Sequence, residues 1–138
     1  GAFVGLTATT TRAQMSRAVL EGVAFAIRDC YEVAKANGLE ITYTNLCGGG
    51  ARSATWRQIF ADVLGISVHI LATEQGPSYG AAILAMVGCG VYRDVAKATE
   101  QMVSVKQKIF PNPQNVAKYQ KKYDTFTKLY PLLKTLSI

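Results

Sequence analysis

The stretch Cys47-Gly48-Gly49-Gly50-Ala51-Arg52-Ser53 joins a segment that predicts a strand to a segment that predicts a helix. Residues 41–47 are rich in β-branched and aromatic side chains, which favour strands. Residues 54–64 carry apolar side chains at helical spacing, Ser53 can cap that helix, and Gly65 can end it. A strand, a glycine turn and a helix in this order indicate an α/β architecture.

The rest of the 138-residue chain continues this alternation. Thr11 and Gln14 can form a capping box at the start of a helix over residues 12–36. The other expected elements are a strand end at 2–6, a strand at 66–71, helices at 76–88 and 94–99, an extended segment at 102–109, and a final helix from Asn112 that Pro131 kinks or ends. Few strands among several packed helices make a thin sheet, so the pattern predicts part of a larger one.

Two of the expected helices carry a continuous apolar stripe. In the first helix it comprises Met15, Val19, Gly22, Val23, Ala26, Ile27, Cys30, Val33 and Ala34, and in the last Val116, Tyr119, Tyr123, Phe126, Tyr130 and Leu133. Apolar residues that recur at helical spacing mark the face that a helix buries. We therefore expect both stripes to pack against a sheet or another helix.

The net charge of +6 is concentrated at the end of the chain. Residues 1–100 hold eight basic and eight acidic side chains, whereas residues 101–138 hold seven lysines and one acid, Asp124. This distribution does not indicate a uniformly basic nucleic-acid binder, and the lysines are interpreted as a solvated helix face. No stretch is typical of a membrane span or a secretory signal, so we expect neither nucleic acid nor a membrane as a partner.

The cysteine and histidine content does not favour a zinc site. Cys30, Cys47 and Cys89 have no metal-ligand spacing, and His69 is the only histidine. The cysteines fit a reducing, cytoplasmic compartment, and we expect each to be a small core residue. His69 stands among apolar residues, which favours a structural role. No carboxylate pair and no Ser-His-Asp arrangement stands out, so no catalytic residue and no metal ligand is predicted.

The glycine stretch carries the clearest indication of chemistry. Glycines let a ligand approach the backbone, and amides at the start of a helix can bind phosphate or ribose oxygens. The alternative is that the glycines only make a tight turn between strand and helix. Arg52 could reach a phosphate or be solvated, and Trp56 could stack on a base, although its spacing with Ile59 and Phe60 favours packing. From these residues we expect a nucleotide-binding piece without visible catalytic machinery.

Several motifs in order resemble one known family. They are Gly5-Leu6-Thr7, residues 17–25 (Arg-Ala-Val-Leu-Glu-Gly-Val-Ala-Phe), residues 48–53 followed by 56–59 and 61–65, and residues 76–82 (Gly-Pro-Ser-Tyr-Gly-Ala-Ala). Together they resemble the C-terminal domain of the FGGY carbohydrate kinases, and the similarity runs essentially end to end. The residues of these motifs and the tail at 119–130 are most similar to the xylulokinase branch of that family.

The resemblance implies a fold, a ligand and a missing part. Residues 1–138 would be a partial ribonuclease H-like (actin-like ATPase) domain, the C-terminal, ATP-side domain fragment of an FGGY kinase. ATP with Mg²⁺ would be the cofactor, with Gly48, Gly49, Gly50 and Ala51 along the adenosine and α-phosphate and Ala54 facing the adenine. Relatives can carry a polar, base-binding residue at that last position, so base recognition here would rest on backbone and shape.

The same resemblance implies what lies outside the chain. The family's catalytic aspartate belongs to an N-terminal, sugar-binding domain, which would be the partner that contacts the sugar substrate, a pentulose such as xylulose. The isolated chain is then expected to be inactive, and exposed sheet edges could favour a homodimer. Two alternatives remain open: a non-catalytic interaction or dimerising module with the same fold, and nucleic-acid binding through residues 106–134.

Overall fold

The structure is a computed structural model that describes residues 1–73 and 76–135. Its elements are α1 (Arg12–Ala36), β1 (Tyr43–Leu46), the 3₁₀ helix η1 (Gly49–Arg52), α2 (Ala54–Leu64), β2 (Ser67–Leu71), α3 (Gly76–Gly88), α4 (Val95–Met102), β3 (Val105–Ile109) and α5 (Pro113–Lys134). They form two units, which are described one at a time. The helical unit comprises Gly1–Glu40, Asp62–Gly65 and Pro111–Ile138, and the sheet unit comprises Ile41–Ala61 and Ile66–Phe110.

In the helical unit, α1 begins at the predicted capping box. The Thr11 hydroxyl accepts a hydrogen bond from the Gln14 amide at 3.3 Å, and the Gln14 side-chain oxygen accepts one from the Thr11 amide at 2.7 Å. These bonds satisfy amide donors that the first helical turn leaves without an intrahelical partner. The prediction of a helix over residues 12–36 is confirmed.

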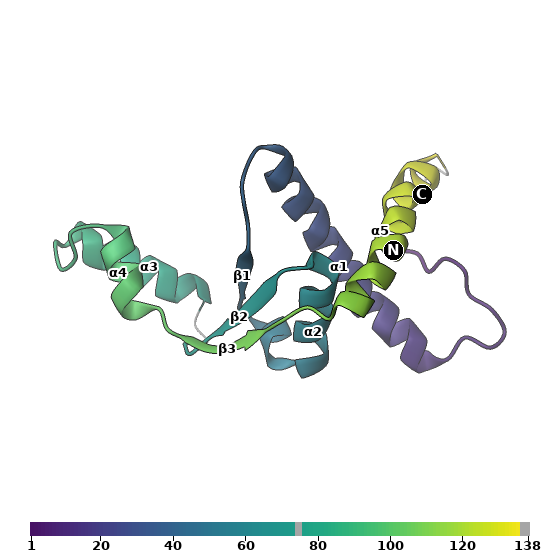
Figure 1. Cartoon of the computed structure of the whole chain (residues 1–138), viewed down its shortest axis with the longest axis horizontal. Helices are drawn as coiled ribbons and strands as arrows, with labels where there is room; N and C mark the ends of the chain where they lie inside the picture. The colour runs from purple at the N-terminus through teal and green to yellow at the C-terminus, as the bar shows by residue number, and fades with distance from the viewer. Residues whose placement is uncertain (74–75, 136–138) are drawn as a thin grey trace. The chain divides into compact units, whose positions relative to one another are not determined.

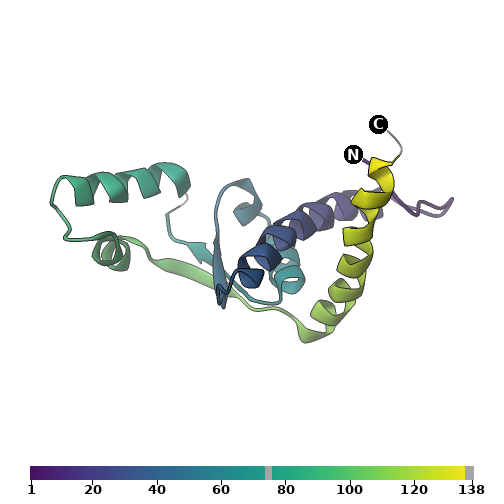
Figure 2. The ribbon, with the colours of Figure 1, turned by 90° about the horizontal axis from the view of Figure 1, so that it is seen from above.

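An aromatic cluster joins α1 to α5, which crosses it (Figures 1 and 2). Phe25 on α1 is only 5 % exposed, and its ring centroid lies 6.0 Å from Tyr119, 6.0 Å from Tyr123 and 5.3 Å from Phe126. Rings at these separations pack favourably beyond the area that they bury. The stripe predicted on the last helix is thus confirmed as a packing face at these positions, whereas Tyr130 is 71 % exposed.

Charged side chains of α1 are also buried in this unit, and each has hydrogen-bond partners. Glu21 accepts from Arg17 Nε at 2.7 Å, from Tyr119 Oη at 2.8 Å and from Lys122 Nζ at 3.0 Å. Burial raises the pKa of the Glu21 carboxyl, but the bonds from Arg17, Lys122 and Tyr119 outweigh it and hold that pKa below its usual value. Buried charge is therefore stabilised by pairing here.

Arg28 and Tyr123 make the second polar link in the helical unit. Arg28 Nη1 donates to the Val63 carbonyl at 3.1 Å, its Nη2 donates to Gln120, and its guanidinium lies 4.2 Å from the centroid of the Tyr123 ring. Burial and a 2.6 Å hydrogen bond to Asp29 raise the pKa of the Tyr123 hydroxyl to about 12. The end of α2, at Val63, is thus tied to α1 and α5.

The sheet unit contains a three-stranded sheet in the order β1-β2-β3. β1 pairs in parallel with β2, with Tyr43 opposite Ser67 and Leu46 opposite Ile70, and η1 and α2 form the connection between them. β3 pairs with β2 in the antiparallel direction, with an irregularity between Ile70 and Leu71. The parallel pair brings the carboxyl ends of β1 and β2 to the same edge of the sheet.

The buried apolar side chains of the sheet unit come from β2 and from the helices. They are Ile59, Phe60 and Ala61 on α2, Val68 and Ile70 on β2, Ile83 on α3 and Ala98 on α4. α3 and α4 pack side by side (Figure 1), and Tyr79 Oη on α3 donates to the Met102 carbonyl at the end of α4 at 2.7 Å. α4 begins at Asp94, whose carboxylate accepts from the Lys97 amide, as predicted, but it extends three residues beyond the expected end at Thr99.

Three expectations from the sequence are wrong, and a fourth is wrong in part. Residues 2–6 form no strand, because no described strand pairs with them. Of the two outcomes expected at Pro131, the end of the helix is wrong, since α5 continues through Pro131 to Lys134. Cys30, Cys47 and Cys89 are exposed rather than core residues: Cys30 lies on an outer position of α1, Cys47 in the loop after β1, and Cys89 in the turn after α3. The stripe predicted on α1 is exposed at Val19, Val23, Ile27 and Val33, since α5 packs on the opposite face, which carries Phe25.

Candidate nucleotide site

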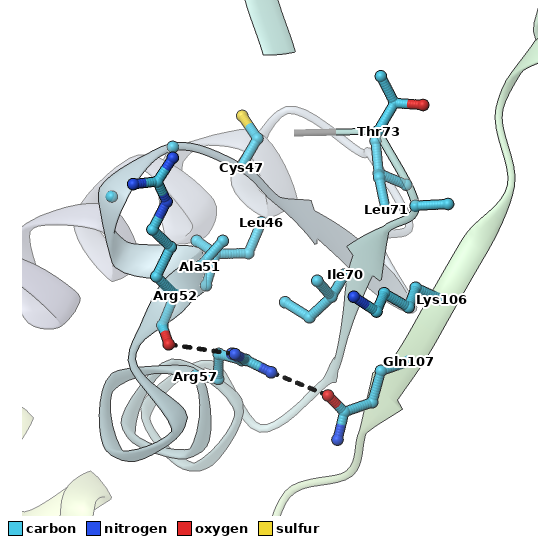
Figure 3. A pocket seen from close by; sticks show the side chains of 13 residues that line it. Leu46, Cys47, Ala51, Arg52, Arg57, Ile70, Leu71, Thr73, Lys106 and Gln107 are labelled. Carbon is cyan, nitrogen blue, oxygen red and sulfur yellow. Dashed lines mark hydrogen bonds between the residues drawn. The ribbon is translucent and has the colours of Figure 1, made fainter. Parts of the chain in front are cut away.

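A cavity of about 440 Å³ opens in the sheet unit at the carboxyl ends of β1 and β2. It is lined by Leu46, Cys47, Gly48, Gly49, Ala51, Arg52, Arg57, Ile70, Leu71, Ala72, Thr73, Lys106 and Gln107 (Figure 3). Ligands of open α/β sheets characteristically bind outside the carboxyl ends of the strands. The cavity therefore lies where the topology favours a binding site.

The glycine loop, residues 48–52, forms one wall of this cavity. Gly48 has a φ of 78°, in the left-handed region that favours glycine, and the 3₁₀ helix η1 starts directly after it. The Ala51 amide donates to the Gly48 carbonyl at 3.1 Å, which closes the first turn. A Cβ added to Gly48 or Gly49 would meet no atom within 4 Å, so the backbone there borders open space that a side chain would occupy.

The predicted site residues divide into two groups. Gly48, Gly49 and Ala51 line the cavity, whereas Gly50 and Ala54 are not among the residues that line it. Gly50 lies against Trp56, because a Cβ there would stand 3.2 Å from the indole Cε3, and Ala54 opens α2. Trp56 stacks on Phe60 with a centroid separation of 5.6 Å, which agrees with its interpretation as a packing residue.

Three basic side chains line the cavity. Arg52 comes from η1, Arg57 from α2 and Lys106 from β3, and no carboxylate from the described part of the chain is on the lining. Arg57 Nη1 donates to Gln107 Oε1 at 2.8 Å and its Nη2 donates to the Arg52 carbonyl at 3.2 Å (Figure 3). The cavity therefore has a positive character, which favours a ligand with negative charge.

The lining combines three kinds of contact. Loop amides and basic side chains can donate to phosphate or hydroxyl oxygens. Leu46, Ile70 and Leu71 supply an apolar surface that suits a flat, weakly polar group. A ligand with a planar apolar part and an anionic part matches this combination.

The histidine takes no part in this cavity. His69 is 8 % exposed, stacks on Tyr43 with a centroid separation of 4.6 Å, and lies with Nε2 3.3 Å from the Ser67 hydroxyl. Its structural interpretation is confirmed. Among residues 1–73 and 76–135, no group of three or more His, Cys, Asp or Glu side chains is placed to hold a metal ion.

The sequence did not identify several lining residues. Thr73 could have been expected, because it follows a strand parallel to the one that ends at Leu46. Lys106 and Gln107 belong to a segment expected only to be extended, and its position beside β2 is a tertiary pairing without a local sequence signal. Arg57 carries no signal beyond its place in the first turn of the helix.

Comparison with known proteins assigns the fold. The FGGY family of carbohydrate kinases, C-terminal domain, matches residues 1–89, which include the glycine loop and the start of the helix after it. The chain belongs to the FGGY family of carbohydrate kinases.

Individual FGGY relatives cover nearly all of this chain. The xylulose kinase of Staphylococcus epidermidis is 33 % identical over 137 residues, which are 99 % of this chain and 28 % of that protein. A solved gluconate kinase from Lactobacillus acidophilus is 28 % identical with a TM-score of 0.84, covering 96 % of this chain and 27 % of the other. A xylulose kinase from Rhodospirillum rubrum is 34 % identical with a TM-score of 0.80, covering 98 % and 28 %.

The FGGY membership confirms the predicted fold class. The chain has the mixed α/β, actin-like ATPase fold of the sugar kinases that it matches, with five α-helices and a three-stranded sheet described. It spans only about 28 % of the length of the curated relatives. No helix among the described residues is long and apolar enough to span a membrane.

Proposed function

We propose that residues 1–138 are the C-terminal, ATP-side domain of an FGGY sugar kinase and that the cavity beside the glycine loop binds ATP. The observation that carries this proposal is the loop itself: glycine backbone and basic side chains border one cavity at the carboxyl ends of parallel strands. The relatives that the chain matches are kinases of xylulose and gluconate, and such enzymes transfer a phosphoryl group.

The residues fit the parts of a nucleotide. Gly48, Gly49 and Ala51 would lie along the adenosine and the α-phosphate, with Gly50 holding the loop against Trp56 and Ala54 near the adenine. Arg52 and Lys106 would add positive charge beside the phosphates. ATP supplies the γ-phosphoryl group, and the contribution of this chain is to position the nucleotide and balance its charge.

Magnesium would arrive with the nucleotide. The described residues offer no cluster of carboxylates for a cation, and Mg²⁺ in kinase sites is commonly held through substrate phosphates with few protein ligands. We therefore assign no metal ligand to this chain.

The sugar would be bound outside these residues. On the family resemblance, an N-terminal sugar-binding domain of the longer protein would provide the catalytic aspartate and the pocket for a pentulose, with xylulose favoured by the relatives' names. The chain spans about 28 % of such relatives, so the isolated chain is proposed to bind nucleotide and to be inactive as a kinase.

The exposed face of α1 supports a larger assembly. Val19, Val23 and Ile27 lie one turn apart and are 53 %, 42 % and 48 % exposed. Contiguous apolar patches of this kind mark interaction surfaces. We assign this face to contact with the remaining polypeptide of the kinase. The relatives are more than three times longer than this chain, and α1 lies within the residues that the family model matches.

The test is an amide NMR titration of the 138-residue chain with MgADP, with AMP and GDP for comparison. We expect saturable shifts concentrated at residues 48–54, larger with ADP than with GDP. Gly49→Leu, whose side chain would enter the cavity, should weaken MgADP binding at least tenfold. Gly80→Leu on the exposed side of α3, where a Cβ also meets no atom within 4 Å, is the matched control and should bind as the wild type does.

The opposite results are equally informative. A well-dispersed spectrum without shifts, repeated on the longer kinase chain with the same result, would exclude the nucleotide site. Equal effects of Gly49→Leu and Gly80→Leu would show that bulk at any glycine destabilises the chain. Phosphoryl transfer to xylulose by the 138 residues alone would overturn the assignment of the catalytic base to another domain.

A second candidate function, a dimerising module, is favoured by one observation. The exposed Val19, Val23 and Ile27 would also suit a dimerising module that binds a second copy. Sedimentation of the chain decides: a stable dimer that Val23→Lys dissociates, together with silence in the MgADP titration, would favour that module. Nucleic-acid binding has less support, because Tyr119 and Tyr123 are 4 % and 9 % exposed and are packed on Phe25, leaving them unable to stack on bases.

A further inference from the structure

The glycine loop has few side chains of its own with which to hold its position. Gly48, Gly49 and Gly50 have no side chains, so groups outside these three residues must fix the position of their backbone. One such group is Trp56, whose ring lies against Gly50. The other is the guanidinium of Arg57, which turns back from the first turn of α2 (Figure 3).

Arg57 connects three elements around the cavity. Its backbone amide donates to the Ser53 carbonyl at 3.0 Å and so belongs to α2. Its Nη2 donates to the carbonyl of Arg52, the last residue of η1, at 3.2 Å, and its Nη1 donates to Gln107 on β3 at 2.8 Å. A single planar group thus holds the end of the glycine loop at a fixed distance from β3.

The hydrogen bonding of Arg57 indicates more than a stability contact. Its Nε is buried and has no hydrogen-bond partner among the described residues. Buried donors without a partner are uncommon in folded proteins, and each calls for an explanation. Function can explain why Arg57 leaves Nε without a partner. The side chain then keeps the orientation in which its two Nη groups reach the Arg52 carbonyl and Gln107.

We propose that Arg57 is a positioning residue for nucleotide binding. It fixes the Arg52 carbonyl against Gln107, and thereby holds the backbone of the glycine loop beside the cavity before the ligand arrives. The inference rests on the proposed function, since it names the residue that preorganises that same site. Lysine cannot replace it, because an ammonium is a point charge and cannot bridge two acceptors with the geometry of a planar fork.

The test combines MgADP affinity with amide hydrogen exchange in the full 138-residue chain. We expect Arg57→Met to weaken MgADP binding about tenfold, as the loss of two hydrogen bonds would, and to accelerate exchange at residues 49–53 in the free chain. Arg57→Lys keeps the positive charge but not the two hydrogen bonds, and should recover little of the affinity. Gln107→Leu should weaken binding less, and the double variant should be no weaker than Arg57→Met, because both changes remove the same connection.

Gln58→Leu is the matched control. Gln58 is the next residue of α2 and donates to the Phe110 carbonyl at 3.1 Å, beyond the end of β3 and away from the loop. This variant also removes a side-chain hydrogen bond of α2, so a purely structural role of Arg57 predicts that MgADP affinity falls in both variants. The positioning role predicts that Gln58→Leu changes MgADP affinity less than twofold.

The outcomes separate this inference from the proposed function. Wild-type binding of MgADP with unchanged affinity in Arg57→Met, or equal losses in Arg57→Met and Gln58→Leu, would overturn the role of Arg57 alone. Absence of binding by the wild type would count against the proposed function. In that case amide hydrogen exchange in Arg57→Met tests the positioning role. Acceleration confined to residues 49–53 supports that role, and unchanged exchange at these residues overturns it.

Discussion

The two faces of α1 differ in exposure, and the more apolar face is the more exposed one. The face that packs on α5 carries the charged residues Glu21 and Arg28, which are 7 % and 9 % exposed, beside Phe25. The face with Val23 and Ile27 is apolar and is 42 % and 48 % exposed at these positions. An apolar stripe therefore identifies a face that is suited to burial, but the segment that packs on the helix decides which face is buried.

The buried face is stable because its polar groups have matching partners on α5 and α2. Glu21 receives three hydrogen bonds, and Arg28 donates to the Val63 carbonyl and to Gln120. A buried charge without such partners would be costly. The exposed face has no corresponding partner in the described residues, which agrees with its assignment to the rest of the kinase.

The largest effect should come from Phe25→Ala. Phe25 contacts Tyr119, Tyr123 and Phe126, and removing a buried ring leaves a cavity in that cluster. We expect a loss of about 3–5 kcal/mol in the free energy of unfolding, measured by urea denaturation. Val23→Ala on the other face is the control and should change it by less than about 0.5 kcal/mol. Similar losses in both variants would mean that the two faces are equally buried.

Glu21→Gln should have an intermediate effect that depends on pH. It weakens bonds from Arg17, Lys122 and Tyr119, and we expect a loss of about 1–3 kcal/mol near pH 7, toward the lower end because Arg17 and Lys122 are more than half exposed. Since the pKa of Glu21 is lowered in the folded chain, its contribution is fully present above the unfolded value of about 4.3.

The contribution of Glu21 is lost as the pH falls through its folded pKa. Urea denaturation of both chains between pH 7 and pH 3 checks this dependence. The difference between wild type and Glu21→Gln should stay constant down to about pH 5 and shrink below it. A difference that grows on acidification would show that the carboxyl is protonated in the folded chain, and would contradict the pairing.

The sequence predicted those parts of the fold that local signals determine. α1 follows from its capping box at Thr11, α2 from Ser53 and Gly65, and the glycine loop from its composition between a strand and a helix. These features depend on residues within a few positions of one another. The exposure of Cys47 and of the α1 stripe could not be predicted, because exposure depends on which segments pack where.

The candidate site shows the same division. The loop positions Gly48, Gly49 and Ala51 were predicted, and the structure brings them to a cavity. Lys106 and Gln107 join that cavity only because β3 pairs with β2 in the antiparallel direction, about sixty residues farther along the chain than the loop. The hydrogen bonds of Arg57 depend on this pairing, so neither its partners nor its proposed role could be inferred from spacing.

Substitutions on the exposed face of α1 should have the smallest effect on the free energy of unfolding of this chain. Val19→Ser, Val23→Ser and Ile27→Ser should each change the free energy of unfolding by less than about 0.5 kcal/mol, because the residues are already in contact with water. In the longer kinase the same substitutions should cost about 1.5–3 kcal/mol each, the value of burying such side chains. Urea denaturation of both chains measures the contrast. Large losses in the 138-residue chain would show that α1 buries this face against the chain itself, whereas small losses in both proteins would show that the remaining kinase polypeptide does not cover it.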